Sequence, residues 1–237
     1  MLNIQDLSVT YPDGTEALRH VSLKLSPGET CGLIGGNGAG KTTLLMALVG
    51  LVQRQGSVRV GDTELTPKTL SKLRQQVGVV FQNPDDQLFL PTVYQNVAFG
   101  LQNMGLPEQQ VRQRSDKTLE LLGISALRDR QAQRLSGGEK RMAALATVLA
   151  MEPKLLLLDE PTAFLDPKAR RRLITVMQQL PQTMLVATHD LTFALETCRR
   201  CVVLTKGALF ADGASKELLF DEKTMEDGGV EAIGIYA

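Results

Sequence analysis

A glycine-rich segment that follows a short apolar run limits the fold of this chain more than any other feature of its sequence. Five of the 21 glycines fall within nine residues, at Gly32, Gly35, Gly36, Gly38 and Gly40. Residues 30–34 are apolar and typical of a strand, and the leucines of residues 41–51 recur at helical spacing. Because glycine readily adopts positive φ, a loop of this kind can turn its N–H groups toward an anion. The segment therefore predicts a phosphate-binding loop, with a purely structural glycine-rich turn as the alternative.

Residues 35–42 match the spacing G-x-x-x-x-G-K-[ST], which assigns chemistry to individual positions. The free amides and the dipole of a helix that begins at Lys41 attract phosphate. We expect Lys41 to contact the β- and γ-phosphates of ATP and the Thr42 hydroxyl to ligate Mg²⁺. The predicted nucleotide contacts in this loop are Gly35, Gly36, Asn37, Gly38, Ala39, Gly40, Lys41, Thr42 and Thr43.

Two carboxylates follow a second apolar run, at residues 155–158. A run without alternation is typical of a parallel sheet that is covered on both faces, and ligands bind at the carboxyl edge of such sheets. We therefore expect Asp159 to hold Mg²⁺ through water, and Glu160 to orient or deprotonate an attacking water. A strand that merely ends in solvated acids is the alternative interpretation.

A Leu-Ser-Gly-Gly-Glu-Lys-Arg segment opens a predicted helix at residues 135–141. Ser136 is a favourable N-cap, and Glu139 three residues later completes a capping box, so a purely structural interpretation is available. That interpretation does not explain Gly137 and Gly138, because glycine in a helix costs up to about 1 kcal/mol relative to alanine. Bare amides at the start of a helix suggest a second phosphate contact.

Strand and helix patterns alternate along most of the chain, which predicts an α/β fold with a mostly parallel sheet. An antiparallel β layer is expected first, from residues 2–10 and 21–25 around a Pro-Asp-Gly turn, and residues 57–60 join it later. Further buried strands are predicted at 76–81, 155–158, 184–187 and 202–204, with helices at 167–180 and 191–199.

The β signal disappears between residues 91 and 151, where amphipathic patterns at 92–101, 108–122 and 136–151 predict an inserted helical subdomain. At roughly 150 residues per domain, the 237 residues suggest one domain with a subdomain. We assign 1–90 and 152–220 to the α/β core with its β layer, 91–151 to the helical subdomain, and 221–237 to a C-terminal tail. The tail begins with polar residues and is expected to be loosely ordered before the apolar residues 230–236 return to a surface.

The charges of the chain cancel, because 26 basic and 26 acidic residues give a net charge of zero. Without a global positive field, nucleic acid is not an expected partner, and local geometry must bind any phosphate. The longest apolar stretches are a few residues, against the about 20 that a membrane span needs. Residues 1–6 lack the pattern of a secretory signal, so we expect a cytoplasmic chain. Three cysteines are too few for a disulfide framework, and Cys31 is expected in the core.

The glycine-rich loop, Leu-Ser-Gly-Gly-Glu and Leu-Leu-Leu-Leu-Asp-Glu-Pro occur in this order, and over nearly its whole length the chain resembles the ABC-type ATPases. The resemblance implies a P-loop NTPase core of the RecA-like type. It also implies that Tyr11 stacks on adenine and that Gln82 links the γ-phosphate and Mg²⁺ to a transport partner. Asp166 corresponds to the loop after the acidic strand, and His189 to the switch histidine. The alternatives are β-sheet packing for Tyr11, a surface position for Gln82 and a polar strand end for His189.

In ABC-type ATPases the signature helix of one subunit covers the nucleotide of the other, so the resemblance implies two chains with two shared sites. Glu160 would position water for in-line attack on the γ-phosphate, while His189 and Lys41 stabilise charge on its oxygens. Gln82 is grouped with these catalytic positions, and closure of the dimer would move it together with the helical subdomain.

A finer resemblance lies in Val-Phe-Gln-Asn-Pro-Asp-Asp-Gln-Leu-Phe at residues 80–89 and in residues 98–101 and 139–144, which look like the ATPases of energy-coupling-factor importers, especially the cobalt and nickel branch. This implies three partners: a second ATPase subunit (the same chain or a paralogue), a transmembrane coupling subunit and a membrane substrate-binding subunit. It also implies a peripheral place on the cytoplasmic face of a prokaryotic cell membrane. Asp85 and Asp86 are predicted to face a basic coupling helix, with a solvated turn as the alternative.

The sequence leaves other functions open, and some of its residues depart from the family pattern. A vitamin such as biotin is an alternative substrate, and a soluble ABC ATPase acting on DNA or the ribosome, or a P-loop phosphotransferase, are alternative classes. Gly36 stands where the family often has proline, and Phe164 where a small residue is usual. Cys198 and Cys201 have redox-type spacing but no second ligand pair, which disfavours a metal or redox site. His20 is expected on the surface, without a partner.

Overall fold

The computed structural model describes residues 1–163 and 165–234. Its N-terminal layer is an antiparallel sheet in the order β2-β1-β4-β5, which confirms the predicted β layer. The alternation of buried residues along β1 changes phase between Ile4 and Leu7, where the ladder with β2 contains a bulge. The strands of this layer are β1 (Leu2–Thr10), β2 (Glu16–Leu25), β4 (Gln55–Val60) and β5 (Thr63–Glu64).

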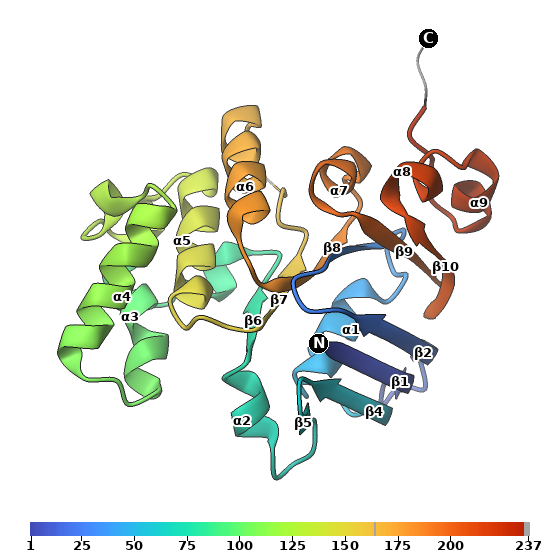
Figure 1. The fold of residues 1–237 in the computed structure, drawn as a ribbon, viewed down its shortest axis with the longest axis horizontal. Coiled ribbons are helices and arrows are strands. Elements are labelled where there is room, and N and C mark those ends of the chain that lie inside the picture. Colours follow the sequence, from blue (N-terminus) through green and yellow to red (C-terminus); the bar gives the residue numbers. More distant parts are fainter. Residues whose placement is uncertain (164, 235–237) are drawn as a thin grey trace.

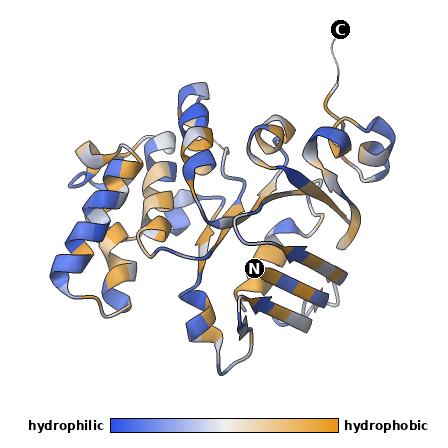
Figure 2. Cartoon of the chain, viewed as in Figure 1, coloured by the Kyte–Doolittle hydropathy of each residue, from blue (hydrophilic) through white to orange (hydrophobic). Residues whose placement is uncertain are grey.

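The second sheet runs through the middle of the molecule in the order β10-β9-β3-β8-β7-β6 (Figure 1). Every neighbouring pair is parallel except β9 with β10, so the predicted mostly parallel sheet is confirmed. Its central strands are hydrophobic along their length (Figure 2), because both faces are covered. The strands are β3 (Thr30–Ile34), β6 (Val77–Val80), β7 (Leu155–Asp159), β8 (Thr183–Thr188), β9 (Arg200–Thr205) and β10 (Ala208–Ala214).

Helices cover the two faces of this sheet. α1 (Lys41–Leu48) lies between it and the N-terminal layer, and contacts both β7 and β2. α6 (Pro167–Gln179) and α7 (Leu191–Thr197) lie over the opposite face (Figure 1). This arrangement leaves the carboxyl ends of β3, β7 and β8, and the loops that follow them, at one edge of the sheet.

The helices α3 (Val93–Asn103), α4 (Glu108–Leu121) and α5 (Gly137–Leu149) form a group beside the β6 edge of the sheet (Figure 1). α3 begins with a capping box between Thr92 and Gln95 and packs against both α4 and α5. The segment between α4 and α5 contains short 3₁₀ turns at Ser125–Leu127 and Ala132–Arg134. The division of the chain at residues 91 and 151 into core and subdomain stays a prediction.

The C-terminal segment differs from the expected loose tail, and that prediction is wrong. Helix α9 (Glu222–Asp227) begins at Asp221, whose side chain accepts a hydrogen bond from the Thr224 amide. Val230 and Ile233 pack against the hydrophobic core, and the Ile233 amide donates to Leu219 O at 2.9 Å. Short-range capping and these later apolar contacts therefore order a stretch whose composition is polar.

Besides α9, the structure adds short elements that the sequence patterns missed, among them the strands β5 and β10 and the helices α2 (Leu70–Arg74) and α8 (Ser215–Leu218). Phe164, and residues 235 and 236 of the predicted apolar end, lie outside the described residues. Among the residues that the structure describes, no helix combines the length and the apolar character needed to cross a bilayer.

Candidate functional site

A cavity of about 540 Å³ lies at the carboxyl edge of the parallel sheet, beside the N-terminal layer. It brings together most of the predicted site residues, which lie far apart in the sequence. Those that line it are Tyr11, Gly36, Asn37, Gly38, Ala39, Gly40, Lys41, Thr42, Thr43, Gln82, Asp159, Glu160 and His189. Gly35 lies just outside the lining and contributes its carbonyl oxygen to a contact with Lys41.

The glycine-rich loop takes its shape from close contacts with distant segments. A side chain at Gly40 (φ 105°) would meet Ala17 O at 2.7 Å, and one at Gly207 (φ 78°) would meet the same oxygen at 2.6 Å. The Gly207 amide donates to Ala39 O at 3.0 Å, and the Arg19 amide donates to Gly207 O at 2.7 Å. The glycine-rich loop and the turn between β9 and β10 can therefore approach strand β2 this closely only because Gly40 and Gly207 have no side chains.

Lys41 is buried and lies over its own loop. Its Nζ donates to Gly35 O at 2.6 Å and to Gly36 O at 3.3 Å, and it lies 3.7 Å from Glu160 Oε1. Two carbonyl oxygens and a carboxylate therefore surround the ammonium, and the residue lines the cavity. Tyr11 lies at the mouth of the cavity, where its hydroxyl contacts Thr43 Oγ1 at 3.1 Å.

Asp159 and Thr42 supply oxygen atoms that fit a magnesium ion. The Thr42 hydroxyl donates to Asp159 Oδ2 at 2.9 Å, and within the described chain the buried Asp159 Oδ1 has no hydrogen-bond partner. Burial raises the pKa of Asp159, while the Thr42 hydrogen bond opposes the rise. A buried carboxylate oxygen next to a hydroxyl is a ligand set that Mg²⁺ prefers, so the residues present fit this ion. Gln82 lines the same cavity.

The Glu160 carboxylate lies between a lysine and a histidine. Its Oε1 is the atom near Lys41, while Oε2 lies 2.9 Å from His189 Nδ1 and accepts from the His189 amide at 3.3 Å. The carboxylate is 9% exposed, whereas the His189 side chain is 70% exposed. Glu160 itself has φ of 44°, and its amide donates to Ala187 O at 2.8 Å. These contacts hold the Glu160 carboxylate, a group that could accept a proton from water, between Lys41 and His189 in the cavity.

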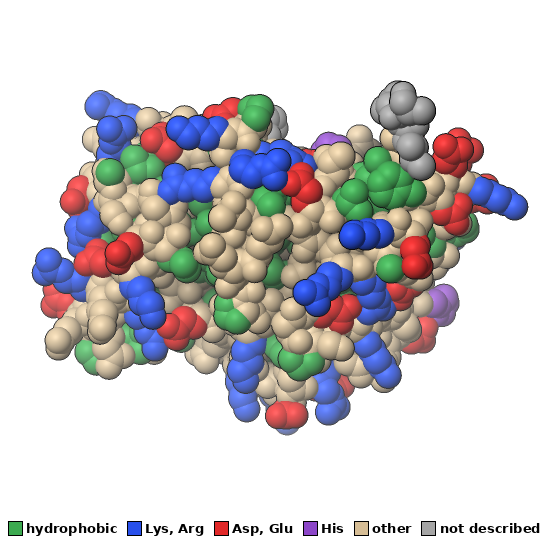
Figure 3. All heavy atoms as spheres, turned by 45° about the horizontal axis from the view of Figure 1, so that its top comes forward, with side chains coloured by type: hydrophobic (Ala, Val, Ile, Leu, Met, Phe, Trp, Pro, Cys, Tyr) green, Lys and Arg blue, Asp and Glu red, His purple; other side chains and the backbone are tan. Residues whose placement is uncertain are grey.

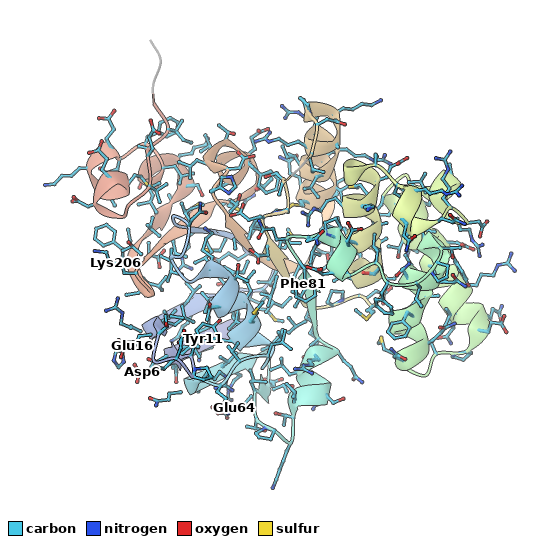
Figure 4. All side chains as sticks on the ribbon, turned by 180° about the vertical axis from the view of Figure 1, so that it is seen from behind. Asp6, Tyr11, Glu16, Glu64, Phe81 and Lys206 are labelled. Atoms are coloured by element: carbon cyan, nitrogen blue, oxygen red, sulfur yellow. The ribbon has the colours of Figure 1, made fainter. Side chains whose placement is uncertain are left out.

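Arg141 of helix α5 contacts the two segments that carry Gln82 and Glu160. Its guanidinium donates to Phe81 O at 2.6 Å, to Gln82 O at 2.5 Å and to Glu160 O at 3.4 Å. The residue is 1% exposed, and burial lowers the pKa of its guanidinium while Asp159 opposes that change. The sequence assigned no role to Arg141, although it lies two residues after the Leu-Ser-Gly-Gly-Glu segment. Figure 4 shows Phe81 between the helices of residues 91–151 and the N-terminal layer.

The Leu-Ser-Gly-Gly-Glu segment lies apart from this cavity. Glu139 accepts from the Ser136 amide at 2.8 Å, and the Ser136 hydroxyl accepts from the Glu139 amide at 3.4 Å, so the predicted capping box is confirmed. The backbone hydrogen bond from Ser136, followed by its hydroxyl, lowers the pKa of Glu139. A second hollow of about 310 Å³ is lined by Ser136, Gly138, Glu139 and Asp166, and Gly137 is the first residue of α5.

Several lining residues of the first cavity were not found from the sequence. Lys206 and Gly207 follow β9 directly, so their place after a predicted strand was a usable signal. Glu16 and Arg19 carry no such signal, because they belong to β2 of the antiparallel layer. Figure 4 shows Tyr11, Glu16 and Lys206 on the same side of the molecule. The Arg19 guanidinium donates to Lys206 O at 2.6 Å, which closes this rim of the cavity.

Asp85 and Asp86, which were predicted to face a basic coupling helix, make contacts within this chain. Asp85 Oδ1 accepts from Lys140 Nζ of helix α5 at 2.6 Å, so its charge already has a partner in this chain. Asp86 lies in the same 3₁₀ turn and accepts from Asn83 at 3.3 Å. His20 is exposed as predicted, but the expectation that it lacks a partner is wrong, because its Nδ1 lies 2.6 Å from Asp6 Oδ1.

The three cysteines are free and buried. Burial raises the pKa of all three thiols, which leaves them protonated and unreactive. The core position predicted for Cys31 is confirmed. In the described part of the chain, no group of three or more His, Cys, Asp or Glu side chains gathers to hold a metal.

Comparisons with known proteins agree with this geometry. The model of the ABC transporter family matches residues 18–163. An ATP-binding protein assigned to ABC transporters in Gloeobacter violaceus is 49% identical over 233 residues, which cover 97% of this chain and 96% of that protein. The energy-coupling factor transporter ATP-binding protein EcfA of Methanothermobacter thermautotrophicus is 43% identical over 227 residues, which cover 93% of this chain and 73% of EcfA.

Among solved structures, cbiO1 from Clostridium perfringens, described as part of the ABC transporter complex cbiONQ, superposes with a TM-score of 0.85 at 37% identity. The match covers 95% of this chain and 93% of cbiO1. The family match, the relatives and the order of the three motifs agree with one another and with the fold. The chain therefore belongs to the ABC transporter family and is an ATPase subunit of the ABC type.

Proposed function

We propose that this chain binds and hydrolyses ATP to drive an importer of the energy-coupling-factor type. The observation that carries the proposal is the buried Glu160 carboxylate, held between Lys41 Nζ and His189 Nδ1 inside a cavity lined by a phosphate-binding loop. A carboxylate in this setting can accept a proton from water, while the lysine and histidine beside it can stabilise negative charge on phosphate oxygens. The similarity to EcfA and to cbiO1 supports the importer type.

The predicted site residues of the cavity each have a part in the proposed reaction. Tyr11 packs against the adenine ring, and the amides of residues 35–43 bind the phosphates. Glu160 orients a water for in-line attack on the γ-phosphate and accepts its proton, while Lys41 and His189 stabilise charge on the phosphate oxygens. Thr42 and Asp159 would hold Mg²⁺, with Gln82 beside them, and the ion neutralises phosphate charge when bound.

We infer that the complete site needs two chains. Ser136, Gly138 and Glu139 line a hollow separate from the cavity that holds Lys41 and Glu160, so one chain cannot close its own signature segment over its own nucleotide. A second copy or a paralogue, docked with its signature segment over this cavity, would complete two equal sites. Asp166, the N-cap of α6, lies in the same hollow as the signature segment and would contribute at the same interface.

The partners and cargo of the importer belong to the same proposal. A transmembrane coupling subunit and a membrane substrate-binding subunit would recruit the chain to the cytoplasmic face of a prokaryotic membrane. Cobalt or nickel ions are the favoured cargo, because residues 80–89 resemble the ATPases of the cobalt and nickel branch of these importers. Basic and acidic side chains are intermixed on the face shown in Figure 3, which fits docking to a protein partner better than a uniform attraction to anionic lipid or nucleic acid.

Co-expression and transport measurements test this assignment. The tagged chain, extracted in mild detergent, is expected to recover a multispanning membrane subunit that raises its ATPase rate. Cells that express the recovered complex are expected to take up cobalt or nickel, and biotin uptake would instead assign the vitamin alternative. Recovery of cytosolic partners alone, such as ribosomal or DNA-bound proteins, would contradict the importer type.

A narrower prediction concerns Asp85 and Asp86, which we propose to face a basic helix of the coupling subunit. The double variant Asp85→Asn with Asp86→Asn is expected to weaken apparent affinity for that subunit by roughly 2- to 30-fold, because it removes two exposed charge pairs, each worth about 0.2–1 kcal/mol. The measurement is ATPase stimulation against coupling-subunit concentration. Asp129→Asn removes another exposed, paired carboxylate and serves as the control. Unchanged stimulation in the double variant would sink this proposal.

A further inference from the structure

Arg141 joins helix α5 to both predicted catalytic loops. α5 begins at the signature segment, and the Arg141 guanidinium lies four residues further along, fully buried. Its three carbonyl partners are Phe81 O and Gln82 O on one side, and Glu160 O on the other. One side chain therefore connects the backbone of Gln82 to the backbone of Glu160.

A packing role alone does not account for this arginine. Burying a charge is unfavourable, and an apolar residue of similar volume fills such a space without that cost. The neighbouring residues of α5 that face the core, such as Met142, Ala143 and Leu145, are apolar. Among the described residues, Arg141 Nε has no hydrogen-bond partner, so the guanidinium is not fully satisfied even here. The position is explained instead by what its two terminal nitrogens bind.

The contact with Glu160 acts on a backbone that is unfavourable for an L-amino acid. Glu160 has φ of 44°, in the left-handed region that non-glycine residues rarely adopt. Its amide donates to Ala187 O at 2.8 Å, and its carbonyl accepts from Arg141. Because both sides of the residue are hydrogen-bonded, the carboxylate is aimed between Lys41 and His189 rather than away from them.

Three further contacts tie the loop of residues 81–87 to α5. Gln87 Nε2 donates to Ala144 O at 2.8 Å and to Thr147 Oγ1 at 2.7 Å, and Lys140 pairs with Asp85. These contacts hold the loop to the helix but do not reach Glu160. Arg141, in contrast, binds both Gln82 O in this loop and Glu160 O at the end of β7.

We propose that Arg141 is a positioning residue that sets the backbone of Gln82 and Glu160 according to the place of helix α5. The inference rests on the proposed role of Glu160 in ATP hydrolysis. A shift of the signature helix is transmitted through the guanidinium to the peptide that carries the general base. The carbonyls that Arg141 binds lie outside the phosphate-binding loop, so we expect its loss to act on the chemical step more than on ATP binding.

Arg141→Met and Arg141→Lys test this role. Methionine removes all three carbonyl contacts and is expected to lower kcat by roughly 10- to 100-fold, because small misplacements of a catalytic group have effects of this size. Lysine keeps the charge but not the fork, and is expected to recover part of the loss. KM and the dissociation constant for ATP are expected to stay within about threefold of wild type, as for a change confined to the chemical step.

Arg74→Lys and Arg74→Met provide the matched control. Arg74 also donates to backbone carbonyls, at Val49 O and Gly50 O, but it lies outside the cavity. The thermal unfolding temperatures of these variants measure how much stability is lost when arginine–carbonyl hydrogen bonds are removed away from the cavity. An unchanged kcat in Arg141→Lys, or a rise in KM with kcat unchanged, would overturn the proposal.

A double-mutant cycle separates this inference from the proposed function, and it uses the milder lysine variant. If Arg141 acts through Glu160, then Arg141→Lys in the Glu160→Gln background should lower the residual single-turnover rate less than about twofold. A full additive loss in that background would refute the positioning role. Wild-type turnover in Glu160→Gln alone would refute the proposed function of Glu160 and requires no Arg141 variant.

Discussion

Replacement of Glu160 by glutamine is expected to lower kcat for ATP hydrolysis by about 10²- to 10⁴-fold, the usual contribution of a general base. Glutamine keeps the shape of the side chain and can still contact His189, but it cannot accept a proton from water. ATP binding is expected to persist, because the phosphate-binding loop and Lys41 are unchanged. With the chemical step blocked, MgATP should accumulate a closed dimer, visible as a larger species in size-exclusion chromatography.

Phosphate release and nucleotide titration measure the two halves of this prediction separately. Glu64→Gln is a suitable control, because Glu64 is an exposed carboxylate in the N-terminal layer and pairs with Arg59. The control variant is expected to hydrolyse ATP at the wild-type rate. Steady-state hydrolysis retained by Glu160→Gln would count against the assignment of the base. A variant that neither hydrolyses nor binds ATP would instead indicate that the carboxylate supports the loop.

Lys41→Met is expected to weaken ATP binding by about 10- to 100-fold. A hydrogen bond to a charged group is worth about 1.5–3 kcal/mol, and each 1.36 kcal/mol changes an equilibrium tenfold. Methionine has a similar length and fits a buried position, so the loop should keep its shape. Lys41 Nζ donates hydrogen bonds to Gly35 O and Gly36 O in this structure. Exchanging these hydrogen bonds for phosphate contacts reduces the net binding energy that Lys41 contributes.

Titration with a fluorescent ATP analogue measures the affinity, and Lys72→Met, which removes an exposed ammonium on α2, serves as the control. Thermal unfolding of Lys41→Met without nucleotide checks that the loss is one of binding. An unchanged affinity would show that the backbone amides bind the phosphates without help from this side chain. A loss of affinity in the Lys72 variant would show that the assay reports general charge.

Local patterns were enough to predict the sheets and most of the cavity. The apolar runs before Lys41 and Asp159 identified parallel strands, and motif spacing then placed Thr42 and Glu160 at one edge. These predictions succeeded because strand direction and loop position follow from periodicity and chain order. The same reasoning predicted the capping box at Ser136, which depends on residues three apart.

Contacts between distant segments were not predictable in this way. Arg141 reaches carbonyls that are 60 and 59 residues away in sequence, and Arg19 reaches Lys206 across 187 residues. Backbone carbonyls carry no sequence signature, so an arginine that binds them looks like any other arginine. The loose order expected for residues 221–229 was wrong, because it was inferred from composition and overlooked the Asp221 cap of α9. The expected return of the apolar residues that follow is borne out by Val230 and Ile233, which pack against the core.

The fit of two glycines around the carbonyl of Ala17 has a consequence for how the protein reaches its native state. A side chain at Gly40 or at Gly207 would clash with that oxygen, although these segments are separated by most of the chain, and the Gly207 amide donates to Ala39 O. These contacts cannot form before residue 207 has been synthesised, and closing the long loop between the two segments costs conformational entropy. The nucleotide loop therefore acquires its final backbone after the β9–β10 hairpin has been synthesised and has docked. A nascent chain that ends before this hairpin would carry the whole glycine-rich motif and still lack a rigid phosphate site.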